Sequence, residues 1–230
     1  MLTVVAAVIV LTFGAYVIEH HDPVPNAGQI VGVPSSSAPA TSSTPRRALT
    51  VAFLGDDYTA GIGVTAAPER FTTMLATALH WTERNFGVPG SGYASAGAGG
   101  NYLRRVAQVV AAAPDIVIVT GGRNDVIDAA STVSADTTAL FAQLHSKLPH
   151  TRLIAVTPFW GDSPPRAALA TVAAAVKTAV LAVGGTYLDI PDPLLGHAEW
   201  MADDADPNAA GYAAIAGALR VPLSAQVPTG

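Results

Sequence analysis

From residue 48 onward, short apolar segments alternate with segments in which apolar residues recur every three or four positions. A continuous apolar run of five or six residues is typical of a strand that is buried on both faces. Such strands belong to parallel sheets that helices cover on each side. We therefore expect a three-layer α/β/α, flavodoxin-like domain with a five-stranded parallel sheet. The expected strands cover residues 49–54, 82–86, 115–120, 152–157 and 185–190, and the expected helices cover residues 68–79, 101–112, 134–147, 164–183 and 208–219.

Polar segments that carry candidate catalytic side chains follow the first three strands and precede the last helix. Ligands of open α/β sheets bind beyond the carboxyl ends of the strands, so we expect these stretches to meet at one edge of the sheet. They are Gly55-Asp56-Asp57 after the first strand, residues 85–93 after the second, Gly122-Arg123-Asn124-Asp125 after the third, and residues 203–208 before the last helix.

In order and spacing, the four stretches resemble the four blocks of the SGNH (GDSL) hydrolase family, over roughly residues 48–220. The resemblance implies an ester hydrolase whose serine attacks a carbonyl carbon. A glycine N–H and an asparagine amide then stabilise the oxyanion, and an Asp-x-x-His block supplies the base and the residue that orients it. By this resemblance the oxyanion donors are Gly90 (or Gly92) and Asn124, and the orienting residue is Asp203.

Two of the three implied catalytic positions depart from the family pattern. Asp57 stands at the position of the serine, and Asp206 stands at that of the histidine, just before Pro207-Asn208. A carboxylate attacks an ester poorly, because the product would be a high-energy anhydride. With an ordinary pKa near 3.9, an aspartate is also a weak base for a hydroxyl group. Loss of one triad member typically leaves only ~10³–10⁴-fold catalysis over water, so the serine-esterase mechanism cannot run on these residues.

Two hypotheses on function follow, and whether the protein is an enzyme stays open between them. The first is a catalytically silent domain that acts as a binding or accessory module for an acylated glycan, a lipid or a membrane partner. The second is an esterase or acyl-group hydrolase with an altered site based on carboxylates or a metal. A phosphoacceptor receiver domain is set aside because its third and fifth strands would end in Asp and Lys, where this chain has Gly121-Gly122 and Ile190-Pro191.

The carboxylates of Asp57, Asp203 and Asp206 share one cleft if they converge as the family pattern implies. Like charges at contact distance raise at least one pKa or recruit a cation. Ligands that offer only oxygen suit Ca²⁺ or Mg²⁺. We expect no cofactor, and keep such a metal as the alternative to a solvated, non-catalytic site.

Four further side chains near this site have more than one interpretation. His197 is either a surface loop residue or a substitute base. Trp160 and Trp200 either line a pocket or pack their own loops. Arg123 occupies the variable position of its block and is expected to be solvated, with the alternative that its charge offsets the nearby carboxylates.

The chain begins with an uncharged apolar segment. Residues 1–18 carry no charged side chain, and a helix of that length just spans a bilayer core. We expect a membrane anchor, with a cleaved secretory signal or a buried helix as alternatives; the first two place the rest of the chain outside the cytoplasm. The expected organisation is an anchor or signal at 1–19, a linker rich in Pro, Ser, Thr and Ala at 20–47, the domain at 48–222 and a flexible tail at 223–230.

The amino-acid composition argues against several classes of function. The formal net charge of −5, without a large basic patch, makes nucleic acid an unexpected partner. The absence of cysteine excludes disulfides, zinc–thiolate sites and thiol catalysis. Oligomeric state is not indicated by any of these features.

Overall fold

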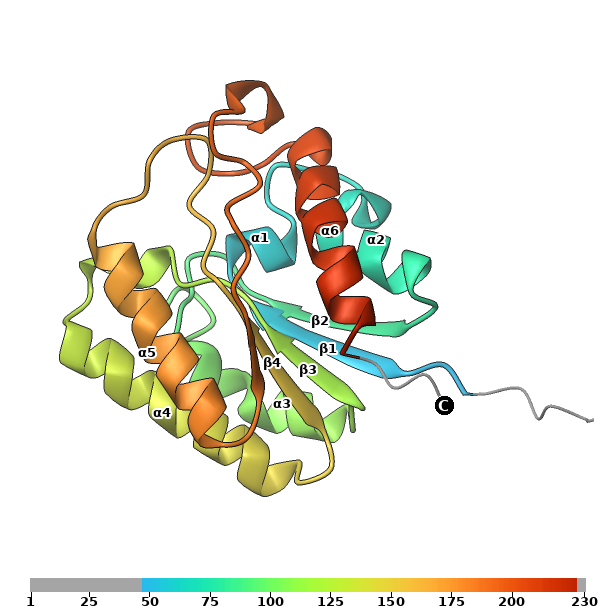
Figure 1. The fold of residues 1–230 in the computed structure, drawn as a ribbon, viewed down its shortest axis with the longest axis vertical. Helices are drawn as coiled ribbons and strands as arrows, with labels where there is room; N and C mark the ends of the chain where they lie inside the picture. Colours follow the sequence, from blue (N-terminus) through green and yellow to red (C-terminus); the bar gives the residue numbers. More distant parts are fainter. Residues whose placement is uncertain (1–46, 227–230) are drawn as a thin grey trace, which may run out of the picture. The chain divides into compact units, whose positions relative to one another are not determined.

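The computed structural model describes residues 47–226, and this part of the chain folds around a five-stranded sheet, which lies at the centre of Figure 1. Every pair of neighbouring strands is parallel, and the strand order is β2-β1-β3-β4-β5, which confirms the predicted α/β sheet. The strands are β1 (Thr50–Gly55), β2 (Thr82–Gly87), β3 (Ile116–Val119), β4 (Arg152–Val156) and β5 (Thr186–Leu188).

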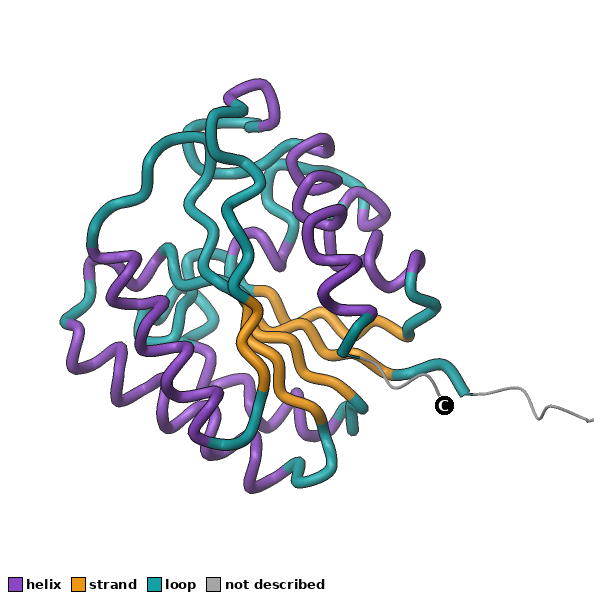
Figure 2. Tube along the Cα trace, in the orientation of Figure 1, coloured by secondary structure: helices purple, strands orange, loops and turns teal. Residues whose placement is uncertain are grey.

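Helices cover both faces of the sheet, as the apolar strands require (Figures 1 and 2). One face carries α3 (Val106–Ala111), α4 (Ala130–Lys147) and α5 (Ala168–Ala182), and the other carries α1 (Asp57–Ala60), α2 (Phe71–Ala78) and α6 (Ala209–Ser224). Side chains alternate between the two cores along β1: Ala52 and Leu54 pack under the first group, Val51 and Phe53 under the second. Each of the two hydrophobic cores therefore receives every second side chain of the central strands.

Local boundaries differ from the predictions at several places. Helix α4 begins four residues earlier than expected, at Ala130, and α6 continues past Pro222 to Ser224, beyond the expected end of the domain. Asn101 does not cap the following helix, because its side chain donates to Asp136 at 3.4 Å instead. The single turn α1 and the 3₁₀ turns at Ala67–Glu69, Tyr102–Arg105, Asn124–Ile127 and Ala198–Trp200 were not predicted, since segments so short show no helical period.

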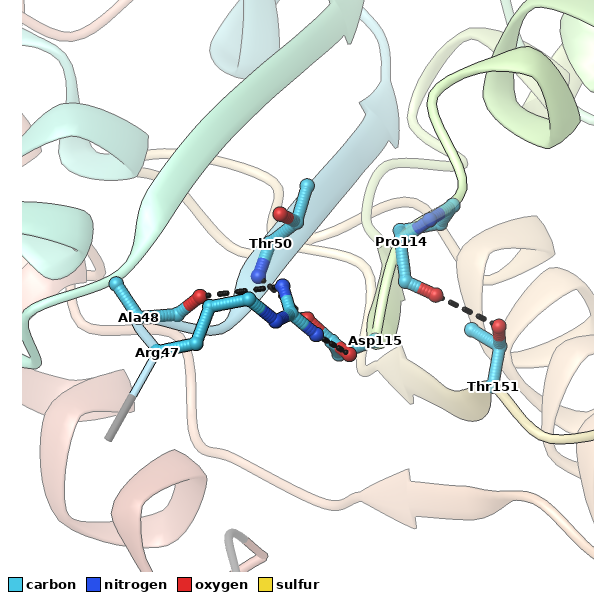
Figure 3. Close-up of polar contacts among 6 residues, drawn as sticks. All are labelled: Arg47, Ala48, Thr50, Pro114, Asp115 and Thr151. Carbon is cyan, nitrogen blue, oxygen red and sulfur yellow. Dashed lines mark hydrogen bonds and ion pairs between the residues drawn. The ribbon is translucent and has the colours of Figure 1, made fainter. Parts of the chain in front are cut away.

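Asp115 fixes the amino edge of the sheet, where the chain enters the domain (Figure 3). Its Oδ2 accepts the Thr50 N–H at 2.7 Å, and its Oδ1 pairs with the guanidinium of Arg47, also at 2.7 Å. Close by, the Thr151 hydroxyl donates to the carbonyl of Pro114 at 2.7 Å. These contacts tie the first residue of β1 to the segment just before β3, and that segment to the residue just before β4, at the edge opposite to the carboxyl ends of the strands.

Within residues 47–226 no helix has both the length and the apolar character needed to cross a bilayer. The predicted anchor or signal segment at 1–19 and nearly all of the predicted linker lie outside the described residues, as does the end of the predicted tail.

Candidate functional site

Helix α1 follows directly after β1 at the carboxyl edge of the sheet (Figure 1). Its first residue, Asp57, is therefore at this edge. Gly55 ends the strand where only glycine fits, since a Cβ there would lie 2.0 Å from Oγ1 of Thr59. Asp56 then caps α1, accepting the Tyr58 N–H at 3.3 Å. Asp57 is consequently the first helical residue, and its half-buried side chain projects beyond the strand end.

The Asp57 carboxylate occupies the two donors that the family pattern assigns to the oxyanion. The Gly90 N–H lies 3.1 and 3.0 Å from its two oxygens, and Asn124 Nδ2 lies 2.8 Å from Oδ2. Asn124 Nδ2 also donates to the carbonyl of Ser91 at 2.9 Å, so both amide hydrogens have an acceptor. Of the two glycines that the resemblance offers, the Gly90 N–H faces position 57, whereas the Gly92 N–H donates to the Ser95 carbonyl of its own loop.

Asp125 holds the loop that presents Gly90, a role that the sequence did not reveal. This buried carboxylate accepts the backbone N–H groups of residues 93–95 at 3.0, 2.8 and 2.9 Å, which fixes the loop that presents Gly90. Gly92 is needed for the approach, because a Cβ there would lie 2.4 Å from both Asp125 carboxylate oxygens. Burial raises the pKa of Asp125, against the three N–H donors. The only sequence clue was its position directly after Asn124.

Asp203 and Asp206 share a loop but do different things. Asp203 is exposed, and its Oδ1 accepts the backbone N–H groups of Ala205 and Asp206, both at 2.8 Å. These bonds hold the pKa of Asp203 below its usual value. Asp203 thus folds its own loop, and among the described residues it makes no side-chain contact with a base.

Asp206 lines the same cavity as Asp57, and the residue as a whole is only 9% exposed. No group in residues 47–226 donates a hydrogen bond to its carboxyl oxygens or pairs with them as a cation. Burial, then the charges of Asp57 and Asp203, raise the pKa of Asp206 to about 6, with Arg123 acting in the opposite direction. The structure therefore brings together Asp57 and Asp206, together with Gly90 and Asn124 around Asp57, and leaves Asp203 at the surface.

A metal does not fit this arrangement of carboxylates well. Within residues 47–226 no three His, Cys, Asp or Glu side chains form a group that could hold a metal ion. The Oδ1 of Asp203 is already committed to two backbone donors. Ca²⁺ takes six to eight oxygen ligands as a rule, which two carboxylates supply only in small part.

The cavity between the loops at this edge has a volume of about 340 Å³. Asp57, Asp206 and the buried Asp56 line one part of it, and most of the wall is apolar. Arg123 and Arg166 also line it, and their guanidinium groups lie 5.0 and 5.8 Å from the centroid of the Trp160 ring. The apolar lining comes from Phe71, Val126, Ile127, Phe159, Trp160 and Ile215.

Arg123 is not the solvated side chain that the sequence predicts. It is partly buried and donates to the backbone carbonyls of Asp204 and Ala205 and to the Tyr58 hydroxyl. Tyr58 in turn donates to the Ala205 carbonyl at 3.1 Å. Through these hydrogen bonds the Arg123 guanidinium ties the loop at 203–206 to the segment that follows β3.

His197 does not act as a substitute base in this geometry, which agrees with its interpretation as a loop residue. Its Nδ1 lies 2.9 Å from a carboxylate oxygen of Glu199, and its ring stacks on Trp200 at 3.7 Å. Neither His197 nor Trp200 lines the cavity, whereas Trp160 does.

A family model described as the GDSL-like Lipase/Acylhydrolase family matches residues 53–214. No curated protein sequence matches the chain. Among solved structures, a lipase/acylhydrolase from Enterococcus faecalis superimposes with a TM-score of 0.61 at 18% identity, covering 79% of this chain and 98% of that one.

Two carbohydrate esterases have the same fold. One is a family two carbohydrate esterase from Clostridium thermocellum in complex with cellohexaose, with a TM-score of 0.63 and 15% identity over 79% of this chain and 66% of that chain. The other is the acetyl xylan esterase Est2A from Butyrivibrio proteoclasticus, with a TM-score of 0.62 and 15% identity over 80% of this chain and 65% of that chain. The chain spans just under two thirds of both esterases, and at these identities the likeness concerns the fold alone.

Proposed function

Because the chain belongs to the GDSL-like lipase/acylhydrolase family, we propose that it is a member without serine-esterase activity that serves as a binding or accessory module. In this proposal the domain acts outside the cytoplasm and is tethered through the apolar segment at residues 1–19. Its ligand is an acylated glycan, a lipid or a membrane partner. The cellohexaose-bound esterase of the same fold supports a glycan among these.

One observation carries the proposal: the Asp57 carboxylate accepts the hydrogen bonds of both Gly90 and Asn124. An oxyanion hole works by offering unoccupied donors to charge that develops in the transition state. Here a permanent negative charge, fixed to the chain, already takes those donors. An ester carbonyl would have to displace this carboxylate, and no serine would then be present to attack it.

The second candidate is a hydrolase that uses the carboxylates themselves. Asp206 favours it, since its pKa of about 6 lets it gain or lose a proton near neutral pH. It lines the cavity beside Asp57, as a pair of carboxylates that activates water must. Against it stands the hydrogen bonding of Asp57, whose oxygens are held by Gly90 and Asn124.

Hydrolysis of p-nitrophenyl acetate separates the two candidates. We expect no turnover by the wild-type chain above a heat-denatured control. The double variant Asp57→Ser with Asp206→His should gain turnover, because Gly90 and Asn124 then face an empty hole beside a nucleophile and a base. Wild-type turnover that Asp57→Ala abolishes would overturn the binding-module proposal in favour of the carboxylate hydrolase. Asp204→Asn, an exposed neighbour in the same loop, is the matched control.

A further inference from the structure

Basic side chains gather at the amino edge of the sheet, opposite to the candidate site. Helices α4 and α5 run back to this edge, because they end just before β4 and β5 begin. Helix α6 ends there too, since the carbonyl of Gln226, two residues past its end, accepts a hydrogen bond from Arg152 at the start of β4. The exposed basic residues of this edge are Arg47, His145, Lys147, His150, Arg152 and Arg220.

The acidic side chains of this edge already have partners. Asp115 pairs with Arg47 at 2.7 Å, so these two residues together add no net charge. Glu83, in the first half of β2, accepts the Thr73 hydroxyl at 2.7 Å. Within residues 47–226 the other Lys and Arg side chains of this edge form no ion pair. The amino edge is therefore positively charged, although the whole chain has a formal net charge of −5.

The carboxyl edge of the sheet has the opposite charge. Glu199, Asp203 and Asp204 are exposed in the loops that follow β5, in addition to the carboxylates of the candidate site. Arg104 and Arg166 are exposed on this side as well, but they are fewer than the acids. An anionic surface therefore attracts the amino edge and repels the edge that holds the cavity.

Two exposed aliphatic side chains belong to the same amino edge. Leu181, near the end of α5, is 52% exposed, and Val221, near the end of α6, is 67% exposed. A cavity of about 310 Å³ opens there, and His145 and Arg152 among its lining residues offer N–H donors to a phosphate group. Basic side chains next to exposed aliphatic ones are typical of a surface that contacts anionic lipid head groups.

We propose that the amino edge rests on the surface of an anionic lipid bilayer, with Lys147, Arg152 and Arg220 against the head groups. This inference rests on the tether of the proposed function, because the chain before Arg47 joins the domain at this edge (Figure 3). A tether keeps the edge near the head groups, so a few charges suffice. The expected linker at 20–47 reaches at most about 90 Å. The tether alone therefore leaves the orientation open, and the charge of the edge sets it.

This orientation narrows the ligand of the candidate site. With the amino edge on the bilayer, the cavity at the carboxyl edge faces away from it. A lipid of the same bilayer would then be out of reach of the cavity, whereas a glycan beyond the bilayer would not.

Paramagnetic lipid head groups test the orientation on the full-length chain. The chain is placed in nanodiscs of phosphatidylcholine alone or of phosphatidylcholine with phosphatidylglycerol, each with a trace of gadolinium-chelating lipid. We expect the amide resonances of Lys147 and Val221 to broaden in the anionic nanodiscs, while those of Gly90 and Asp204 stay sharp. The broadening should weaken without phosphatidylglycerol and in about 1 M NaCl, where the Debye length is about 3 Å.

Variants locate the contact. Lys147→Gln and Arg220→Gln should each lower the ratio of docked to free domain about fivefold, because each basic side chain near an anionic surface contributes attraction of that size. Arg104→Gln removes an exposed arginine outside this edge and should leave the ratio unchanged. An equal loss in Arg104→Gln would contradict docking through the amino edge.

The same measurement separates this inference from the tether on which it rests. Equal broadening at both edges, broadening of Gly90 in place of Lys147, or no effect of phosphatidylglycerol would overturn the inference even if the chain is held in both kinds of nanodisc. A chain that leaves phosphatidylcholine nanodiscs but docks on the anionic ones through Lys147 would refute the tether and support the inference. No association with either kind would overturn both.

Discussion

Replacement of the buried Asp56 by asparagine should stabilise the protein at alkaline pH and leave it unchanged in acid. Burial, and next the negative charge of Asp57, raise the pKa of Asp56 from 3.8 to about 7. The folded protein thus holds this proton more tightly than the unfolded chain does. The stability contributed by the protonated group is complete below pH 4 and is lost as the pH rises through 7.

The magnitude follows from the difference of about 3 between the two pKa values. Each pKa unit corresponds to about 1.36 kcal/mol. The ionised Asp56 carboxylate therefore lowers the free energy of unfolding by roughly 4 kcal/mol at pH 8. Asparagine keeps the oxygen that accepts the Tyr58 N–H, so the cap of α1 is retained. We expect Asp56→Asn to raise the free energy of unfolding by about 2–4 kcal/mol at pH 8 and by less than about 1 kcal/mol at pH 4.

Urea denaturation of both proteins at several pH values between 4 and 8 measures this difference. The exposed Asp204→Asn removes a charge of the same sign without changing burial and should show no such pH dependence. A gain from Asp56→Asn that is the same at pH 4 and pH 8 would refute the reasoning, as would a loss at pH 8, because Asp56 would then be ionised without cost.

Three further outcomes are expected from the geometry. Gly92→Ala should lower the free energy of unfolding by about 1–3 kcal/mol, since its Cβ would meet the Asp125 carboxylate at 2.4 Å; a neutral effect in urea denaturation would contradict this close approach. Asp115→Ala should cost about 1–3 kcal/mol by leaving the Thr50 N–H without its 2.7 Å acceptor, whereas Thr50→Ala, which keeps that N–H, is the control. Millimolar Ca²⁺ or Mg²⁺ should leave the melting temperature unchanged, because the described residues contain no group of three metal ligands; a rise that disappears in Asp206→Asn would show a metal site after all.

The sheet was predictable because its evidence is local and repeated. Runs such as Ile116–Val119 are buried on both faces, and a run of that kind has few alternatives to a central parallel strand. The meeting of the polar stretches at one edge followed from the parallel order of the strands. Turns of one helical repeat, such as α1, carry no period and were missed for that reason.

The candidate site was predictable as a set of positions but not as a set of contacts. The spacing placed Asp57, Gly90 and Asn124 together, yet it could not show that the Asp57 carboxylate accepts the hydrogen bonds of both donors. It also could not show that Asp203 bonds its own loop while Asp206 faces inward. These hydrogen-bond partners depend on side-chain rotamers and on burial by segments distant in the chain. Neither can be predicted from the local sequence.

Binding of acetate at Gly90 and Asn124 tests most directly whether Asp57 fills the oxyanion hole. Acetate is a free counterpart of the Asp57 side chain and competes for the same two donors. We expect acetate to leave the NMR resonances of the Gly90 amide and the Asn124 side-chain amide unmoved in the wild-type chain and to shift both in Asp57→Ala. Equal shifts in the two proteins would contradict it, because the donors of the wild-type chain would then be open to a ligand.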